Sequence, residues 1–262
     1  MPLTHFKCAA GKVAVADCLN KCPAGSRCLS LPTLTEVGKV RNLDKFSVTQ
    51  LINPTRIEYL KLTQNYAVDP KDRAFLLLGT RHHQKLDVVA QKLNMISESR
   101  MVSGEVTGQA DLLEPIDGTD TYRLIDYKSW GGFAVRKALG TELKDPDVHD
   151  TALQLNHYRL MFEEVGFKIV ELFVQVTVRD YSAQTSKQYN LTEKMFLIPM
   201  PFMPDNEVRD YFTDKSERLC YALKDGVMPE MCDYDSRWGG RRCRFYCEVA
   251  EFCPEGRAVN KL

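Results

Sequence analysis

The chain has 262 residues, with 35 Lys and Arg, 35 Asp and Glu and 44% hydrophobic residues, values typical of an ordinary folded domain with a sizeable core. Its zero net charge excludes a globally basic protein, so any site for a polyanion must be local. The longest apolar runs, such as residues 74–78, are far shorter than the roughly 18 residues of a membrane-spanning helix, and Met1–Lys7 lacks a signal-peptide core, so we expect a cytoplasmic protein without membrane contact.

Cysteines mark both ends of the chain. Eight of the nine fall into two quartets of nearly equal spacing, C-x9-C-x3-C-x5-C and C-x10-C-x3-C-x5-C. The quartets are Cys8, Cys18, Cys22 and Cys28, and Cys232, Cys243, Cys247 and Cys253. An odd cysteine count in a cytoplasmic chain argues against a disulfide framework, whereas four thiolates suit a tetrahedral zinc or a 4Fe-4S cluster. Spacing does not separate these metals, and buried or stray thiols are the alternative.

We predict three parts: a Cys-rich metal-binding module at residues 1–45, an α/β core at 46–225 and a second Cys-rich module at 226–262. In the core, Ser47 caps a short helix and Asn53-Pro54 begins the next one. Residues 72–93 predict a longer helix with one apolar stripe that faces the core. The stripe comprises Phe75, Leu78, His82, Leu86, Val89 and Leu93.

Strands and two further helices follow along the core. Residues 106–116 and 122–130 predict two strands joined by the Asp117-Gly118 turn, which makes a hairpin. Residues 147–165 return to helix, and 169–178 and 195–199 predict further strands, the first of them central because it is almost continuously apolar. Residues 208–223 predict a helix in which Cys220 is expected to be a packed core thiol.

The hairpin carries two carboxylates and a lysine. Asp126 and Lys128 lie on the same face of their strand because side chains alternate with period two, and Asp111 comes from the neighbouring strand. Two carboxylates are suitable ligands for Mg²⁺ or Mn²⁺, and a nearby ammonium suits the activation of water against a phosphodiester. The same residues often form solvated ion pairs, and Asp-x-Lys alone is a weak motif.

Two helices add polar side chains. His83 stands one turn after Gly79, whose missing side chain leaves room for a metal or a strand. His82 falls on the apolar stripe, where a packed imidazole is the simpler interpretation. Gln154 and Tyr158 are four residues apart on one helix face, so both can reach one site, although Tyr158 alone would pass for a core residue.

In this order, the residues resemble the motifs of the RecB-like branch of the PD-(D/E)XK nucleases. The matching motifs are Gly79-x3-His83, Gly108-x2-Asp111, Asp126-x-Lys128 and Gln154-x3-Tyr158. The likeness extends over residues 46–255 and is nearest to the small iron-sulfur exonucleases of that branch, which include the CRISPR adaptation nuclease and stand-alone phage or prophage relatives. It implies a PD-(D/E)XK restriction-endonuclease-like core, a mixed sheet flanked by helices, with Cys-rich metal-binding modules at both ends. No helicase motif or phosphate-binding loop is present, which excludes a helicase-nuclease.

The resemblance also implies roles. His83, Asp111, Asp126 and the Tyr127 carbonyl would hold Mg²⁺ or Mn²⁺, and Lys128 would position the attacking water and offset charge in the transition state. Gln154 and Tyr158 would hold the DNA strand or the hydrogen-bond network of the site. The implied catalytic set is therefore Asp111, Asp126, Lys128, Gln154 and Tyr158.

The resemblance places a 4Fe-4S cluster at the carboxyl-terminal quartet, Cys232, Cys243, Cys247 and Cys253. Relatives often carry their first cluster cysteine in a Ser-x5-Cys-Pro context, and the equivalent stretch here, Ser47–Pro54, has Asn53 in that place. Cys232 or one of the amino-terminal cysteines would then supply the fourth ligand. For the amino-terminal quartet we predict zinc.

A basic and aromatic segment lies within the second Cys-rich module. It contains Arg237, Trp238, Arg241, Arg242 and Arg244. Guanidinium groups mixed with aromatic rings suit phosphates and unstacked bases, so we predict a DNA-binding segment. The alternative is a solvated basic face with Trp238 packed on the metal module.

Together these observations favour a metal-dependent DNA exonuclease that acts on single strands or duplex ends in a bacterial or phage-infected cell. Recombination or CRISPR-adaptation proteins are its expected partners. Two alternatives stay open: a structure-specific endonuclease or nickase, and a non-catalytic nucleic-acid-binding protein with two metal knots. Hydrolysis of end-labelled DNA would distinguish the enzyme from the binding protein.

Overall fold

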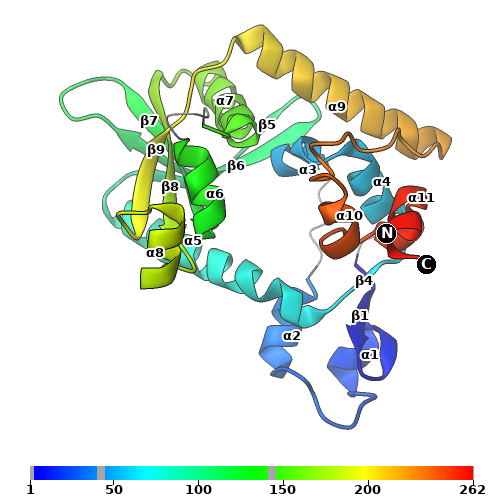
Figure 1. The fold of residues 1–262 in the computed structure, drawn as a ribbon. Helices are drawn as coiled ribbons and strands as arrows, with labels where there is room; N and C mark the ends of the chain where they lie inside the picture. Colours follow the sequence, from blue (N-terminus) through cyan, green and yellow to red (C-terminus); the bar gives the residue numbers. More distant parts are fainter. Residues whose placement is uncertain (1–2, 40–44, 141–145, 262) are drawn as a thin grey trace. The chain divides into compact units, whose positions relative to one another are not determined.

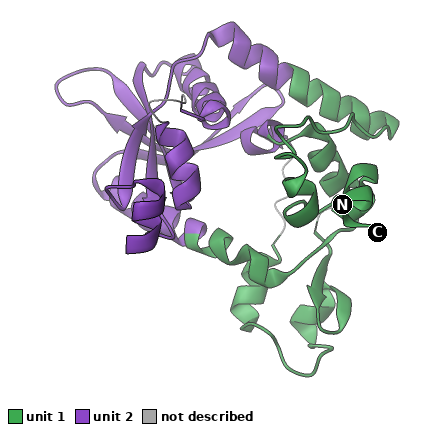
Figure 2. Cartoon of the chain, in the orientation of Figure 1, with its two compact units in different colours: residues 1–44, 53–78, 214–262 green, residues 45–52, 79–213 purple. Residues whose placement is uncertain are grey.

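A computed structural model of the protein describes residues 3–39, 45–140 and 146–261 (Figure 1). By its contacts the chain divides into two compact units, which Figure 2 colours separately. Unit 1 comprises residues 1–44, 53–78 and 214–262, and unit 2 comprises residues 45–52 and 79–213. Both ends of the chain, and hence both cysteine quartets, thus belong to unit 1, together with residues 53–78.

Unit 2 is built on a mixed six-stranded sheet with the order β3-β6-β7-β8-β9, in which β5 also pairs with β6. The strands are β3 Phe46–Ser47, β5 Ile96–Ser103, β6 Val106–Pro115, β7 Tyr122–Trp130, β8 Ile169–Val178 and β9 Met195–Pro199. The β6–β7 hairpin is antiparallel and β7–β8 is parallel, which confirms the predicted mixed sheet. It also confirms that residues 169–178 form an interior strand, since β8 lies between β7 and β9.

Helices flank this sheet, as predicted. They are α3 Val48–Ile52, α5 Ala74–Lys92, α6 Gly132–Leu139, α7 His149–Glu164, α8 Ala183–Tyr189 and α9 Asp205–Asp225, of which α5 and α9 continue into unit 1. Helix α7 packs against β5, β6, β7 and β8 (Figure 1). Every residue from Ala152 to Phe162 is buried. Because α7 is enclosed on all sides, its polar side chains must find partners inside the protein.

The start of α3 follows from a reciprocal cap. Ser47 Oγ accepts a hydrogen bond from the Gln50 amide at 3.2 Å, and Gln50 Oε1 accepts one from the Ser47 amide at 2.9 Å. This is the capping-box arrangement, which satisfies two of the free amides at a helix start. The predicted cap at Ser47 is confirmed. Four elements of unit 2, namely β3, β5, α6 and α8, were not predicted from the sequence.

Helix α5 confirms the predicted helix but not its buried stripe. Phe75, Leu78, Val89 and Leu93 are between 47% and 59% exposed. Two members of the predicted stripe do lie against the sheet: Leu86 packs with Ala90 on a cluster of Leu112, Ile125 and Tyr127, and His82 lies edge-on to the Tyr127 ring. The stripe is therefore covered only in its middle, and His83 beside it points toward the carboxylates of β5 and β6.

Unit 1 contains a three-stranded sheet of order β2-β1-β4, formed by β1 His5–Cys8, β2 Gly11–Ala14 and β4 Ala67–Val68. Its helices are α1 Val15–Asn20, α2 Leu31–Val37, α4 Thr55–Thr63, η1 Pro70–Arg73, α10 Arg241–Phe245, η2 Ala250–Phe252 and α11 Pro254–Asn260. Glu248 is bound by Lys61 at 3.1 Å and by Arg73 at 3.3 Å, which joins the last segment of the chain to α4 and η1.

Two further findings concern single predictions. The residues 208–223 are helical as predicted, within α9, but Cys220 is exposed, so its prediction as a packed core thiol was wrong. Among the described residues, no helix has the length and apolar character needed to cross a membrane.

Candidate metal centre

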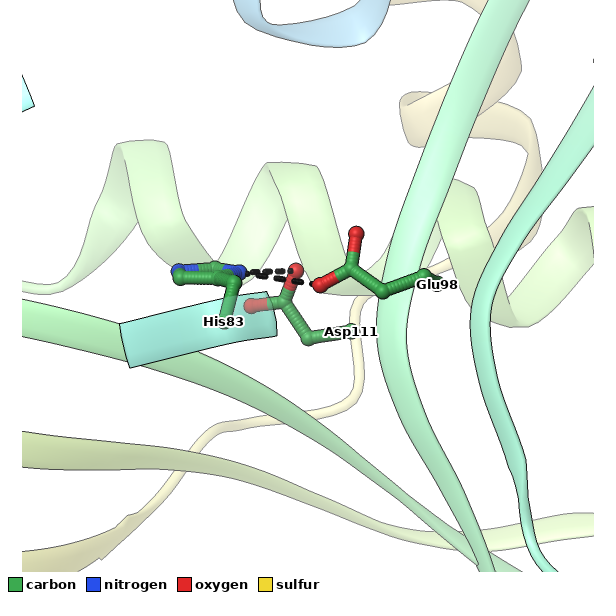
Figure 3. Close-up of side chains that lie close together, drawn as sticks. All are labelled: His83, Glu98 and Asp111. Carbon is green, nitrogen blue, oxygen red and sulfur yellow. Dashed lines mark hydrogen bonds and ion pairs between the residues drawn. The ribbon is translucent and has the colours of Figure 1, made fainter. Parts of the chain in front are cut away.

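One cluster of metal-ligating side chains stands out in unit 2. In the part of the chain that the structure describes, His83, Glu98 and Asp111 form the one group of three or more His, Cys, Asp or Glu residues whose ligand atoms all lie within 4.8 Å of one another. They come from α5, β5 and β6, and Figure 3 shows both carboxylates directed at the same imidazole nitrogen. His83 Nδ1 is 3.1 Å from Glu98 Oε1 and 3.2 Å from Asp111 Oδ1.

Glu98 is the member that sequence reasoning missed. The β5–β6 register pairs Ser97 with Leu112 and Ser99 with Ala110, so Glu98 lies opposite Asp111. Its φ is 47°, a left-handed conformation that costs a non-glycine residue on the order of 1–3 kcal/mol. Gln109 Nε2 donates to Glu98 Oε2 at 2.5 Å and fixes the carboxylate. No local motif marks Glu98; the signal is its place opposite Asp111.

The two carboxylates keep His83 protonated. Hydrogen bonding to Asp111 raises the pKa of His83 to about 9, with the charges of Asp111 and Glu98 acting in the same direction against burial. His82, the neighbouring imidazole, lies edge-on to the Tyr127 ring with 5.9 Å between ring centres. Burial lowers the pKa of His82. The structure therefore separates a histidine directed at carboxylates from one that packs on an aromatic ring.

The second part of the site is a hydrogen-bonded chain from β7 to α7. Lys128 Nζ lies 2.6 Å from Asp126 Oδ2 and donates to Gln154 Oε1 at 3.3 Å. Gln154 Nε2 lies 3.1 Å from Asp126 Oδ1 and 3.2 Å from the Tyr158 hydroxyl. The structure thus brings together the four side chains that the sequence placed on one strand face and one helix face.

The two charged groups of this hydrogen-bonded chain, Asp126 and Lys128, are largely shielded from solvent. Asp126 is 2% exposed, and burial raises its pKa, with the charge of Asp111 acting in the same direction and that of Lys128 opposing it. Burial lowers the pKa of Lys128, but the charge and hydrogen bond of Asp126 and the charge of Asp111 together raise it more, so the ammonium stays charged. Among the described residues, Asp126 Oδ2 accepts no hydrogen bond of normal geometry and has only the Lys128 ion pair. A buried carboxylate oxygen of this kind can accept a cation.

Asp111 connects the two parts. The β6–β7 pairing runs from Pro115–Tyr122 to Leu112–Ile125. Just beyond it, Asp111 Oδ2 accepts a hydrogen bond from the Tyr127 amide at 2.6 Å. Oδ1 of the same carboxylate contacts His83. The role predicted for the Tyr127 carbonyl stays a prediction.

The two glycines of the sequence motifs differ. A Cβ on Gly108 would lie 2.6 Å from Tyr158 Cε1, so Gly108 is needed for the close approach of α7. At Gly79 a Cβ would meet no atom within 4 Å. In the part of the chain that the structure describes, no atom occupies the room that we expected beside Gly79 for a metal or a strand.

The donor set fits a divalent cation. Two carboxylates and an imidazole meet within one ligand shell, and Asp126 offers a further buried oxygen. Carboxylate oxygens suit Mg²⁺ and Mn²⁺, and the nitrogen ligand favours Mn²⁺. The imidazole must lose its proton before it can bind a cation.

Unit 1 holds the remaining predicted residues. All four carboxyl-terminal cysteines, Cys232, Cys243, Cys247 and Cys253, line one pocket together with apolar side chains that include Ile57, Leu60 and Val249. Burial raises the pKa of Cys232 to about 11, with further contributions from Cys253 and Cys247. Asn53 accepts a hydrogen bond from Arg242 at 3.1 Å, beside this pocket. The amino-terminal quartet, Cys8, Cys18, Cys22 and Cys28, lies around α1 and the β1–β2 hairpin.

In the predicted DNA-binding segment, some side chains contact other residues of the protein and others are exposed. Arg242 stacks on the Trp238 ring at 5.4 Å and also donates to Ser236 O at 3.3 Å. Arg237 donates to Asp233 O at 3.3 Å. Arg241 and Arg244 are exposed, and Trp238 is 52% exposed.

A mixed sheet whose hairpin carries carboxylates and a lysine, with a histidine and a glutamine–tyrosine pair on flanking helices, is the arrangement of a metal-dependent nuclease. The family model for the PD-(D/E)XK nuclease superfamily matches residues 47–254, and the chain belongs to this superfamily. The predicted superfamily is thus confirmed, while the relationship to the iron-sulfur exonucleases stays a prediction. Among solved structures, "Crystal structure of SSO0001" is similar with a TM-score of 0.46 and 16% sequence identity, over 85% of this chain and 91% of that chain. No curated protein matches the chain.

Proposed function

We propose that the protein is a metal-dependent deoxyribonuclease that acts as an exonuclease on single-stranded DNA or duplex ends. One arrangement carries the proposal: the His83, Glu98 and Asp111 cluster is joined through Asp111 to a β7 strand that carries the buried Asp126 and its half-buried partner Lys128. Mg²⁺ or Mn²⁺ would be held by these three residues and Asp126, with the Tyr127 carbonyl as a further ligand. When bound, such an ion lowers the pKa of a coordinated water and offsets negative charge on the phosphate.

Side chains of the protein itself would orient the attacking water and keep the site in place. Lys128, held by Asp126 and Gln154, presents a charged ammonium that orients the attacking water and offsets charge as it develops on the phosphate oxygens. Gln154 lies between Asp126 and Tyr158 and keeps both in place. Burial raises the pKa of Tyr158, so its hydroxyl stays protonated and acts through hydrogen bonds.

Contact with DNA is proposed for the carboxyl-terminal segment of unit 1. Exposed Arg241 and Arg244 offer guanidinium groups to phosphates, and half-exposed Trp238 offers a ring face to an unstacked base. Arg237 and Arg242 belong to the same predicted set, but the guanidinium of Arg242 stacks on the Trp238 ring and donates a hydrogen bond to Asn53. We therefore assign phosphate binding to the two exposed arginines and positioning of Trp238 to Arg242.

The carboxyl-terminal thiol pocket is the proposed site of the 4Fe-4S cluster. Its four cysteines surround one apolar-lined space, and the Arg56 guanidinium lies 3.8 Å from Cys253 Sγ, where it can offset the negative charge of a thiolate-bound cluster. Cys232 lines the pocket and would replace the cysteine that relatives carry at the position of Asn53. Cluster binding would contribute to the folding of this segment. Brown colour and iron in anaerobically purified protein, both lost in Cys247→Ser, would support this assignment.

A substrate comparison tests the enzymatic proposal. Purified protein is incubated with Mn²⁺ and end-labelled linear single-stranded DNA, linear duplex, or covalently closed circles of either form. An exonuclease releases nucleotides from linear DNA and leaves circles intact. Lys128→Ala should reduce cleavage by several decades while DNA affinity changes by less than about tenfold, because the lysine acts mainly in the transition state. Lys187→Ala, an exposed lysine on α8, serves as the matched control.

The other outcomes identify the alternatives. Cleavage of closed circles would indicate the endonuclease or nickase. DNA binding without metal-dependent cleavage would indicate the non-catalytic binding protein. Recombination or CRISPR-adaptation partners, a phage or bacterial host and a cytoplasmic location remain proposals that rest on the resemblance to the iron-sulfur exonucleases.

A further inference from the structure

The amino-terminal segment gathers four thiols around a small hairpin and one short helix. Cys8 ends β1 and is paired with Gly11 across the β1–β2 turn. Cys18 lies in α1 and is 7% exposed. Cys22 and Cys28 follow in the connection from α1 to α2. Helix α1 packs against both strands of the hairpin and against α2, which holds Cys18 beside the hairpin that carries Cys8.

Hydrogen bonds fold the connection back against the end of α1. Arg27 Nη2 donates to Leu19 O at 3.0 Å and to Asn20 O at 3.2 Å. Cys22 Sγ donates to Ser26 O at 3.1 Å. At the hairpin, the Ala10 amide donates to Cys8 Sγ at 3.4 Å, an arrangement that stabilises a thiolate bound to a metal.

This segment has almost no apolar core. The residues 19–33 include no buried side chain, and the buried apolar side chains of residues 3–39 are Leu3, Phe6, Cys18, Leu34 and Val37. Fixing one residue costs roughly 1–2 kcal/mol in backbone entropy, which burial of apolar surface normally offsets. The connection between α1 and α2, residues 21–30, has no buried side chain and lacks that compensation. Metal binding by the surrounding thiols would supply it, because the free energy of binding is then also free energy of folding.

We propose that Cys8, Cys18, Cys22 and Cys28 bind a zinc ion as a second, structural metal site, distinct from the carboxylate centre and from the carboxyl-terminal thiol pocket. Among the described residues, the pocket lined by Cys232, Cys243, Cys247 and Cys253 is lined by none of the four amino-terminal cysteines, so the two quartets lie at different places in unit 1.

Zinc suits this site better than an iron-sulfur cluster. Zinc has no redox chemistry and tolerates solvent, and here Cys28 is exposed while Cys8 and Cys22 are half-buried. With Zn–S bonds of about 2.3 Å, tetrahedral ligand sulfurs lie about 3.8 Å apart. Among the described residues, no three of these sulfurs lie within 4.8 Å of one another, so zinc binding would require the thiols to move closer together.

The test is metal analysis of the full-length protein after anaerobic purification. Wild type should contain about one zinc per chain at this site, following its closed four-thiolate type. Cys22→Ser and Cys28→Ser should each lose that zinc and keep whatever iron the wild type holds. Cys220→Ser, at an exposed cysteine outside both quartets, should keep both metals. Cobalt substitution should give thiolate-to-cobalt absorption in wild type and Cys220→Ser only.

Limited trypsin digestion supplies a readout that does not depend on nuclease activity. Zinc removal or Cys28→Ser should speed cleavage at Lys21 and Arg27, while cleavage at exposed Lys187 should not change. Zinc retained in both cysteine variants would overturn the proposal, as would loss of iron in Cys22→Ser, which would indicate one cluster with ligands from both chain ends. If Cys22→Ser does not fold, Cys28→Ser decides, because that thiol is exposed. Asp126→Asn should abolish cleavage and keep zinc, so failure of the enzymatic proposal is distinguishable.

Discussion

The ion pair between Asp126 and Lys128 allows a quantitative test of the site. Lys128→Met removes the ammonium that lies 2.6 Å from Asp126 Oδ2 and leaves a carboxylate that is 2% exposed without its cationic partner. Breaking a buried pair from one side costs about 3–5 kcal/mol. Protonation of the carboxylate limits the cost, because burial already raises the pKa of Asp126 and the loss of Lys128 removes the main opposing charge. We expect unit 2 to lose about 3 kcal/mol near neutral pH.

The pH dependence has a definite sign. An acid whose pKa is higher in the folded state binds more protons folded than unfolded, so stability falls as the pH rises from the unfolded-state pKa toward the folded-state pKa. Lys128→Met should therefore be less stable at pH 8 than at pH 6. The double variant Asp126→Asn with Lys128→Met carries neither charge and should recover about 2–3 kcal/mol, which is a non-additive coupling of residues in contact. It should still fail to cleave DNA.

The two tryptophans of the chain make this measurable for unit 2. Trp130 ends β7 in unit 2 and Trp238 lies in unit 1, so a Trp238→Phe background assigns the fluorescence change in urea to unit 2. Lys187→Met controls for the loss of a surface lysine. The reasoning is refuted if Lys128→Met is as stable as its parent, if the double variant loses as much as the two single variants summed, or if single-turnover cleavage survives in either Lys128 variant.

Three further outcomes follow from single positions. Gly108→Ala should lower the melting temperature of unit 2, because the added Cβ would lie 2.6 Å from Tyr158 Cε1 and overpacking costs about 1–3 kcal/mol. The control Gly79→Ala should not lower it. Equal melting temperatures of the two variants would contradict the close approach of α7 to Gly108. Burial lowers the pKa of His157 to about 4, so the stability of the protein should be full above about pH 6.5 and should fall by about 3 kcal/mol as the pH drops toward 4. This magnitude follows from a pKa difference of about 2.5 at about 1.4 kcal/mol per pKa unit. In urea denaturation, His157→Leu should show a flatter dependence of stability on pH, and an unchanged dependence would exclude His157 as its cause. Because the pKa of His83 is about 9 without metal, Mn²⁺ must displace a proton from it, and the affinity of the protein for Mn²⁺, measured by calorimetry, should rise about tenfold per pH unit from pH 6.5 to 8. His83→Gln should bind Mn²⁺ more weakly and lose most of this pH dependence. A wild-type affinity that does not depend on pH would argue against His83 as a ligand.

The parts of the site that depend on local spacing were predictable from the sequence. Asp126 and Lys128 share a strand face because they are two residues apart, and Gln154 and Tyr158 share a helix face because they are four apart. The hairpin bounds follow from the Asp117-Gly118 turn between two apolar runs. The structure brings these four side chains into one hydrogen-bonded chain.

The contribution of Glu98 was not predictable, because it depends on contacts between segments far apart in the sequence. Strand β5 reads Ile-Ser-Glu-Ser-Arg-Met-Val-Ser and has neither a clear alternation nor a buried residue. Its register is set by pairing with β6, which places Glu98 opposite Asp111, and its φ of 47° belongs to a backbone that only the surrounding structure can hold.

The same long-range cause explains the error in α5. Amphipathicity predicts that the largest apolar side chains face the core, and for an isolated helix on a sheet this minimises exposed apolar area. Here the sheet covers only the middle of the predicted stripe, where His82 and Leu86 lie against Tyr127 and its neighbours, and it leaves Phe75, Leu78, Val89 and Leu93 exposed. Which part of an apolar helix face is covered depends on which strands lie beneath it, and that is set by strand pairing between segments far apart in the sequence.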